Sequence, residues 1–279
     1  MILAPLRGVT IRCFRETFAE PIRVAGFTEA ITPFISALKG YDPLKDRELS
    51  KPSSASTAFL RLTPQFIGKD PLALRHCLQK IKDAGYETAD LNCGCPYPMV
   101  RNKGRGSGLL RTPKVLQAML AVGCEVMGPG KFSIKARLGI DRNDELLNLM
   151  PLINAFPLRF LTIHARNAKQ MYDGSCDWDA VAQVERVSQV PVVRNGDLPV
   201  GSQGLVGRAF IRALADREDI HELLMRYIAA SETELFGDHS VLGRMKELLA
   251  YWKDLPRWKP RWSVIKLCRS TEELRQVIA

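Results

Sequence analysis

Apolar, strand-like runs recur along the first 200 residues, and amphipathic segments separate most of them. The strand-like runs fall at 2–4, 30–35, 59–62, 88–92, 132–137, 160–164 and 191–195. Patterns with apolar residues three or four positions apart fall at 71–84, 112–127, 145–155 and 178–187, and each begins near Asp, Thr or Pro. A strand followed by a helix, repeated about every thirty residues, predicts parallel βα units. Seven or eight such units predict an α/β fold, a closed (β/α)8 TIM barrel.

The last barrel unit departs from this rhythm. Nine residues, GDLPVGSQG, separate Asn195 from the next apolar pair, Leu205 and Val206. A crossover between parallel strands usually needs a dozen or more residues and contains a helix. Nine extended residues reach roughly 30 Å, enough to run back along a strand of about 17 Å. We therefore expect the barrel to close without the helix between strands 7 and 8, leaving a gap in the outer ring.

From residue 211 the pattern becomes wholly helical, as in IHELLMRYIAASETELF, HSVLGRMKELLAYWKDL and STEELRQVIA. We therefore predict two domains, a barrel at 1–210 and a small helical domain at 211–279. The helical part contains Trp252, Trp258 and Trp262 among lysines and arginines. These rings could stack on nucleotides while the cations bind phosphate, or they could form the core between helices.

Composition is that of an ordinary globular protein, with 46% hydrophobic and 25% charged residues among 279. The formal net charge of +10 favours a polyanionic partner. Part of this charge lies in residues 241–279, which hold nine Lys/Arg against four Asp/Glu; a solvated helical face is the alternative reading. No signal peptide and no run of eighteen apolar residues is visible, so we expect a cytoplasmic protein without a membrane segment.

The seven cysteines are odd in number and scattered, so we do not expect a disulfide framework. Cys93 and Cys95 could begin a metal site, but no second pair at ligand spacing completes it, and we expect no metal. These two residues instead belong to the most informative segment, LNCGCPYPMVRNKGRGSGLL at 91–110. It places a thiol where a buried strand ends, beside a basic loop rich in glycine. In a parallel barrel, this end of the strand faces the active-site mouth.

The chain resembles the flavin-dependent tRNA-dihydrouridine synthases. Their Asn-x-Gly-Cys-Pro signature stands here as Asn92 to Pro96, and further matches follow in the expected order: Ala4-Pro5, Gln65, Lys135 in SIKARLG, His164 in IHAR, Asn195-Gly196-Asp197 and Gly207-Arg208. Each match alone is weak, but six in order at barrel spacing are specific. The chain departs from the family in the short connection before Leu205 and in Ala209, where the family usually has glycine.

The resemblance implies FMN at the barrel mouth and NADPH as reductant, although no dinucleotide fingerprint is visible. It places the cofactor on Ala4, Pro5, Leu6, Gln65, Lys135, His164, Asn195, Gly196, Asp197, Gly207 and Arg208. Side-chain alternation independently puts Ser133, Lys135 and Arg137 on one face of their strand. A buried ammonium needs an anion, which would be either a reduced flavin or a neighbouring carboxylate.

The activity implied is reduction of the C5=C6 bond of a D-loop uridine in tRNA, with Cys95 giving a proton to C5. A thiol with an unperturbed pKa of about 8.5 is mostly protonated at neutral pH and can serve as a general acid. We expect a monomer whose RNA contacts come from Asn92, Arg101, Lys103, Arg105, Arg137, Arg166, Lys169, Arg244, Arg257, Lys259 and Arg261. The alternatives are a tRNA-binding relative without flavin and an FMN barrel that reduces a small molecule.

Overall fold

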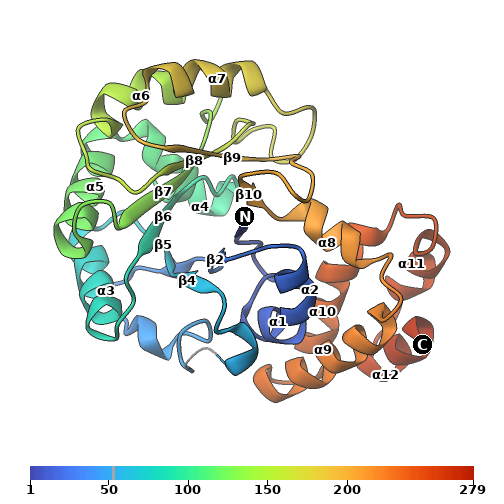
Figure 1. The fold of residues 1–279 in the computed structure, drawn as a ribbon. Coiled ribbons are helices and arrows are strands. Elements are labelled where there is room, and N and C mark those ends of the chain that lie inside the picture. The colour runs from blue at the N-terminus through green and yellow to red at the C-terminus, as the bar shows by residue number, and fades with distance from the viewer. Residues whose placement is uncertain (52–53) are drawn as a thin grey trace.

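A computed structural model describes residues 1–51 and 54–279. In these residues ten strands, all parallel, form one sheet (Figure 1). The strands are β1 (Ile2–Leu3), β2 (Glu29–Ile31), β3 (Ile35–Ser36), β4 (Arg61–Thr63), β5 (Gln65–Ile67), β6 (Ala89–Cys93), β7 (Phe132–Arg137), β8 (Leu161–His164), β9 (Val192–Asn195) and β10 (Leu205–Val206).

The ten strands occupy eight barrel positions, because two of those positions are interrupted at prolines. Pro33 lies between β2 and β3, and Pro64 lies between β4 and β5. Proline cannot donate a ladder hydrogen bond, so regular pairing breaks at these residues. Strand β2 pairs with β1 and β4, while β3 pairs with β5, which pairs with β6. Because β1 also pairs with β10, the sheet closes and the predicted barrel is confirmed.

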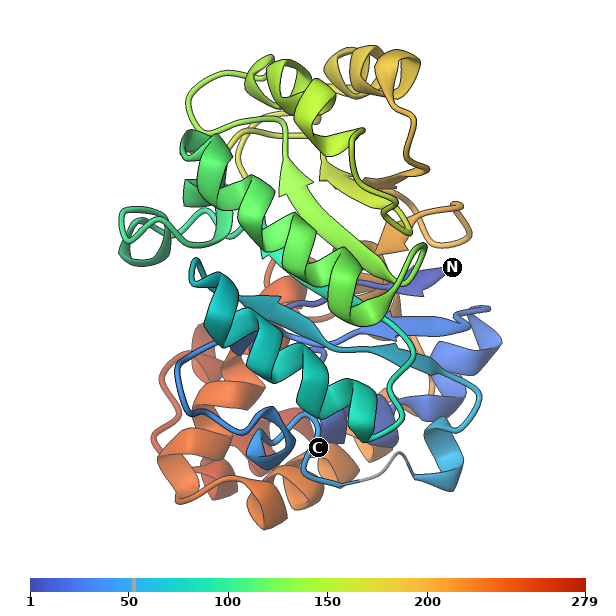
Figure 2. The same ribbon diagram turned by 90° about the vertical axis from the view of Figure 1, so that its left-hand side faces the viewer.

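The outer ring contains the four helices that the sequence predicts. They are α3 (Pro71–Asp83), α5 (Pro113–Met127), α6 (Glu145–Ile153) and α7 (Trp178–Val187). Figure 2 shows α3 and α5 lying side by side across the outside of the sheet. The ring is completed by α1 (Arg12–Thr17), α2 (Ala19–Val24) and α8 (Arg208–Leu214), with a short α4 (Pro98–Arg101) and a 3-10 segment, η3 (Gly106–Arg111), beyond β6.

Two barrel units lack an α-helix within the described residues. Between β9 and β10 the chain makes only turns, which confirms the predicted gap. At this gap, Arg194 of β9 forms a bidentate ion pair with Glu185 of α7, at 2.8 and 2.7 Å, and this pair partly covers the strand. The second gap, between β3 and β4, was not predicted. That connection contains the 3-10 turns η1 (Pro43–Lys45) and η2 (Ala55–Thr57).

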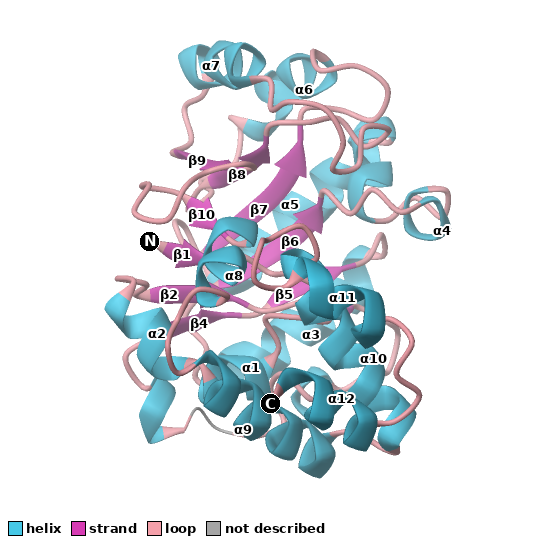
Figure 3. Ribbon diagram, turned by 90° about the vertical axis from the view of Figure 1, so that its right-hand side faces the viewer, coloured by secondary structure: helices cyan, strands magenta, loops and turns pink. Residues whose placement is uncertain are grey.

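The C-terminal helices pack on the first βα unit (Figure 3). They comprise α9 (Ile220–Glu234), α10 (Asp238–Leu249), η4 (Ala250–Trp252), α11 (Lys259–Ile265) and α12 (Thr271–Ile278). Phe14 and Phe18 of the first unit stack on each other at 4.5 Å, and both meet the ring of Tyr227 on α9 edge-on. The predicted boundary at residue 210 falls inside α8, whose Phe210 and Ile211 join the same cluster. The division into two domains therefore stays a prediction.

Candidate active site

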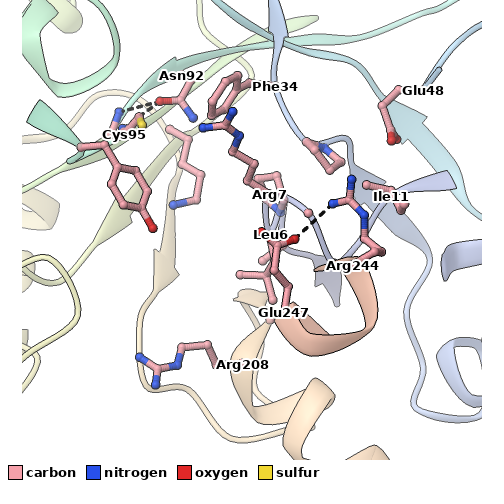
Figure 4. A pocket seen from close by; sticks show the side chains of 18 of the residues that line it. Leu6, Arg7, Ile11, Phe34, Glu48, Asn92, Cys95, Arg208, Arg244 and Glu247 are labelled. Atoms are coloured by element: carbon pink, nitrogen blue, oxygen red, sulfur yellow. Dashed lines mark hydrogen bonds and ion pairs between the residues drawn. The ribbon is translucent and has the colours of Figure 1, made fainter. Parts of the chain in front are cut away.

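A cavity of about 820 Å³ opens where the barrel strands end, between them and the C-terminal helices (Figure 4). This volume lies within the range of small-molecule and cofactor sites. It is lined by thirteen of the residues that the sequence analysis selected: Ala4, Pro5, Leu6, Asn92, Cys95, Lys135, Arg137, His164, Asn195, Gly196, Gly207, Arg208 and Arg244. The barrel topology thus brings together residues from six strand ends.

The Cys95 thiol stands on a turn that Asn92 holds in place. The side-chain oxygen of Asn92 accepts hydrogen bonds from the amide N–H groups of Gly94 at 3.1 Å and Cys95 at 2.8 Å (Figure 4). Gly106 supports the turn from the other side, because a Cβ there would lie 2.7 Å from the Cβ of Cys95. Burial raises the pKa of the Cys95 thiol. The group is therefore protonated at neutral pH, as a proton donor must be.

A buried chain of hydrogen bonds extends from this turn into the barrel. Asn92 donates to the side-chain oxygen of Gln65 at 2.9 Å, and the amide nitrogen of Gln65 donates to Asp90 at 2.7 Å. Ser133 donates to the other carboxylate oxygen of Asp90 at 2.6 Å. Burial raises the pKa of Asp90 to about 6. Gln65 is fully buried and its side chain is used in this chain, so its predicted contact with a cofactor stays a prediction.

Lys135 lines the cavity and forms no ion pair or side-chain hydrogen bond with the part of the chain that the structure describes. The expected alternative, a bridge to a neighbouring carboxylate, is therefore not formed there. Burial, followed by the charge of Arg137, lowers the pKa of Lys135 to about 7. An anionic ligand would restore the charged form, because an opposite charge within a few ångströms favours it.

His164 presents a second polar atom without a partner. Its Nδ1 atom is buried and has no hydrogen-bond partner within residues 1–51 and 54–279. Burial, together with the charges of Arg137 and Lys135, lowers the pKa of His164 well below its usual value, so the ring is neutral. Gly207 lets the chain after β10 pack closely against the chain after β1, because a Cβ there would lie 2.8 Å from that of Ala4. These features fit a flat, anionic cofactor such as the expected flavin.

Three further predicted cofactor residues, Asn195, Asp197 and Arg208, have side-chain partners within the protein. Asn195 donates to the carbonyl of Leu205 at 2.7 Å and so joins β9 to β10 where the crossover helix is missing. Asp197 does not line the cavity and pairs with Arg166. Arg208 lies over the rings of Tyr172 and Tyr251 at 5.6 and 5.9 Å. Gly196 has a φ of +141°, a value that favours glycine.

The predicted RNA-binding cations are dispersed. Arg101, Lys103 and Arg105 lie on or beside α4, which projects from the barrel in Figure 3. Arg137 donates to the carbonyls of Gly94, Asn167 and Met171, and Arg166 donates to that of Gly174. Lys169 pairs with Asp141 at 2.9 Å, Arg244 pairs with Glu247, and Arg257 contacts His221. Lys259 begins α11. Arg261 lies over the ring of Trp258.

Two of the three tryptophans in the helical region lie in the core between helices. Trp252 and Trp258 are buried, and their indole nitrogens donate to the carbonyls of Ile211 at 2.6 Å and Ala215 at 3.1 Å. These rings form core between α8 and the last helices, and they are not stacking platforms for nucleotides. Trp262 packs at the edge of the same core and is partly buried.

The sequence analysis missed several residues that line the cavity: Arg7, Phe34, Arg47, Tyr172 and Tyr251. Arg7 follows Ala4-Pro5-Leu6 directly, so its position just beyond the first strand could have predicted that it lines the cavity. Tyr251 lies more than forty residues beyond the last strand, and nothing local in the sequence indicates its position.

Among the described residues, no group of three or more His, Cys, Asp and Glu side chains could hold a metal ion. No helix there is long and apolar enough to cross a membrane.

Comparison with known proteins yields matches of two kinds. A family model described as Dihydrouridine synthase (Dus) matches residues 2–202. The chain is 28% identical to "tRNA-dihydrouridine(16) synthase" of Shigella flexneri, with 71% of this chain and 64% of that protein covered. It is 30% identical to "tRNA-dihydrouridine synthase B" of Vibrio cholerae, with 71% and 60% covered. The chain thus spans less than two thirds of these relatives. A third, "tRNA-dihydrouridine(16) synthase" of Haemophilus influenzae, is 26% identical, with 99% and 97% covered.

Solved structures resemble the barrel. The old yellow enzyme homologue from Zymomonas mobilis superposes with a TM-score of 0.55 at 12% identity, covering 76% of this chain and 85% of that chain. Morphinone reductase superposes with a TM-score of 0.54 at 11% identity, covering 76% and 82%. At this level of identity the likeness concerns the fold alone.

Proposed function

We propose, from the premise that the chain belongs to the dihydrouridine synthase family, that it reduces the C5=C6 bond of a D-loop uridine in tRNA. The proposed cofactor is FMN and the proposed reductant is NADPH. One observation carries the proposal. A protonated thiol at Cys95 and two polar groups without partners, on Lys135 and His164, line the same cavity.

The cofactor would lie against the strand ends that carry Lys135, His164 and Gly207. When bound, FMN would supply the hydride that reaches C6 of the base, and NADPH would supply the electrons. Lys135 would hold the electron-rich edge of the ring through its ammonium. His164, which is neutral, has one ring nitrogen free to hydrogen-bond with the ligand. Gly207 keeps the chain after β10 close to Ala4 at the edge of the cofactor space, and Arg208 can bind phosphate through two nitrogens.

Cys95 would provide the proton that completes the reduction. Its S–H bond breaks as a C–H bond forms at C5, and the thiolate left behind lies near the cations Arg7, Arg137 and Lys135. Burial favours the protonated thiol before the step, and the neighbouring positive charges stabilise the thiolate that remains after it. The bonds from Asn92 to the turn keep the sulfur at a fixed position beside the ligand space.

The RNA would have to present a flipped base to this cavity, at a cost of a few kcal/mol in lost stacking. Contacts with phosphate must offset that cost. The net charge of +10 supports such contacts, as does the similarity to tRNA-dihydrouridine synthases. The cations on the α4 loop and on α11, of which Lys103 and Lys259 are exposed, are the proposed sources. The protein would act as a monomer in the cytoplasm.

The test uses purified protein incubated with FMN, NADPH and tRNA that lacks dihydrouridine. We expect bound flavin, and NADPH oxidation that accelerates when the tRNA is added. Cys95→Ala should keep flavin and RNA binding but lose most dihydrouridine formation. Cys93→Ala is the matched control, because Cys93 is fully buried and packs in the core. Protein that stays colourless would favour a tRNA-binding relative without flavin. Oxidation driven by a small unsaturated compound, and not by tRNA, would favour a small-molecule reductase.

A further inference from the structure

The cavity extends past the proposed cofactor site to a second end, which we call the α10 end. It is lined by Arg7 after β1, Phe34 between β2 and β3, Arg47 after β3, and Ser240 and Arg244 of α10. Figure 4 shows Arg7 extending toward Phe34, with Arg244 and Glu247 on the helix nearby. Most of the residues expected to hold the cofactor come instead from β7, β8, β9 and the start of α8. The two sets meet at the loop after β1, where Ala4, Pro5 and Leu6 directly precede Arg7.

The acidic groups at the α10 end already have partners within the protein. Three of the four carboxylates that line the cavity form ion pairs: Glu48 with Arg15 at 2.8 Å, Glu234 with Arg12 at 2.6 Å and Glu247 with Arg244 at 3.3 Å. The fourth, Asp46, accepts hydrogen bonds from the hydroxyl of Tyr41 and the amide of Glu48, both at 3.0 Å, and so stabilises its own loop. Two of the pairing arginines, Arg12 and Arg15, lie outside the cavity.

Arg7 and Arg47 are left with uncompensated charge. Neither guanidinium forms an ion pair or a hydrogen bond within residues 1–51 and 54–279, and both side chains are exposed. Arg7 is held over the ring of Phe34, with 5.4 Å between its Cζ and the ring centroid. This contact orders the side chain before a ligand arrives, which lowers the entropy cost of binding. Two guanidinium groups that line one cavity without ionic partners favour an anion with several oxygens.

The position of Arg7 indicates which anion the site would bind. Arg7 and Cys95 line the same cavity, and Arg7 is exposed whereas Cys95 is buried, so Arg7 lies nearer the cavity mouth than the thiol. The anion would therefore lie at the mouth, beside the entering base, while Arg208 is available for the cofactor phosphate. A flipped nucleotide remains connected to its neighbours through phosphodiesters, and these stay at the cavity mouth when the base enters.

We propose that Arg7, held by Phe34, and Arg47 form a binding site for the phosphodiester adjacent to the flipped nucleotide. This inference rests on the proposed function and adds a substrate-positioning site to it. The site draws the RNA backbone against the barrel side of the cleft, opposite α10. It thereby fixes how far the base can enter toward Cys95.

The experiment measures tRNA affinity against salt concentration for Arg7→Ala and Arg47→Ala. Each variant should reduce the slope of log affinity against log salt by about 0.7 to 0.9, the value for one lost phosphate contact. Arg7→Lys should keep the slope but bind more weakly, because lysine cannot make a bidentate contact. Arg186→Ala is the matched control, since Arg186 is an exposed arginine of α7 that does not line the cavity. It should leave the slope unchanged.

Flavin content and the KM for NADPH serve as further readouts on the same proteins. The inference predicts that both stay unchanged in Arg7→Ala and Arg47→Ala. An unaltered salt slope would overturn it. A raised KM for NADPH, or loss of flavin, would also overturn it, because the anion would then be a dinucleotide or cofactor phosphate. Failure of the unsubstituted protein to bind tRNA would remove the proposed function and this site together, whereas an unaltered slope in a protein that modifies tRNA removes the site alone.

Discussion

The buried carboxylate of Asp90 permits a quantitative test of the hydrogen-bond chain behind the catalytic turn. Ser133 donates to one of its oxygens at 2.6 Å and Gln65 to the other at 2.7 Å, and all three side chains are fully buried. Ser133→Ala removes the first of these bonds. A hydrogen bond to a charged group contributes about 1.5–3 kcal/mol, so we expect the free energy of unfolding to fall by that amount at about pH 8.

The pH dependence of this loss has a definite sign. Burial raises the pKa of Asp90 in the folded protein to about 6, above its usual value, while the bonds from Ser133 and Gln65 lower it. Ionisation of Asp90 therefore costs stability as the pH rises through about 6. Without the Ser133 hydroxyl the pKa rises further and the cost above pH 6 grows. At about pH 5, where Asp90 is protonated, the loss should shrink to about 0.5–1.5 kcal/mol, the value of a neutral hydrogen bond.

Urea unfolding of Ser133→Ala at both pH values provides the measurement. Thr162→Val is the matched control, because it also deletes a buried hydroxyl from an adjacent strand. The Thr162 hydroxyl has no hydrogen-bond partner within the described residues, so its loss should cost little or increase stability. The reasoning would be refuted if the two variants were equally stable, or if the loss in Ser133→Ala were the same at both pH values.

Three further predictions concern the site and the bundle. Gly106→Ala should lower the rate of dihydrouridine formation far more than Gly104→Ala, although both glycines have positive φ, because the new Cβ at 106 would lie 2.7 Å from the Cβ of Cys95; equal rates would contradict this. Flavin affinity should fall as the pH rises through about 7, because Lys135 then loses the proton that an anion requires, and Lys135→Met should remove this dependence in a fluorescence titration. Trp258→Ala should lower the free energy of unfolding by about 3–5 kcal/mol, since the ring is buried, and a loss below about 1 kcal/mol would argue against its core position.

Much of the barrel could be predicted because its signals are local. The outer helices α3, α5, α6 and α7 each carry an apolar stripe, and the strand ends at Asn92, His164 and Asn195 carry polar residues where the mouth must lie. The short connection before Leu205 could also be interpreted, because a covalent chain of nine residues has a fixed reach. The second gap was not predicted, although Pro43, Pro52 and the serines of KPSSAS at 51–56 disfavour a continuous helix between β3 and β4.

Other features depend on contacts that the sequence does not reveal. Trp258 has cationic neighbours in sequence, yet its ring is buried because α8 packs over it and the carbonyl of Ala215 accepts its N–H. Tyr251 reaches the cavity only because the C-terminal helices dock on the first βα unit. Arg137 shares a strand face with Lys135, as alternation predicts, but loop carbonyls occupy its guanidinium. Such pairings arise between segments far apart in the chain, so propensity and periodicity cannot supply them.

The central claim is that the thiol of Cys95 acts on a uridine of tRNA inside this cavity. Its most direct test is to map dihydrouridine in tRNA from a strain that lacks the protein, complemented with either the unsubstituted gene or one encoding Cys95→Ala. The account predicts that one D-loop position loses dihydrouridine in the deletion strain, regains it with the unsubstituted protein and stays uridine with Cys95→Ala. Full dihydrouridine at every position in the deletion strain, or restoration by Cys95→Ala, would contradict it.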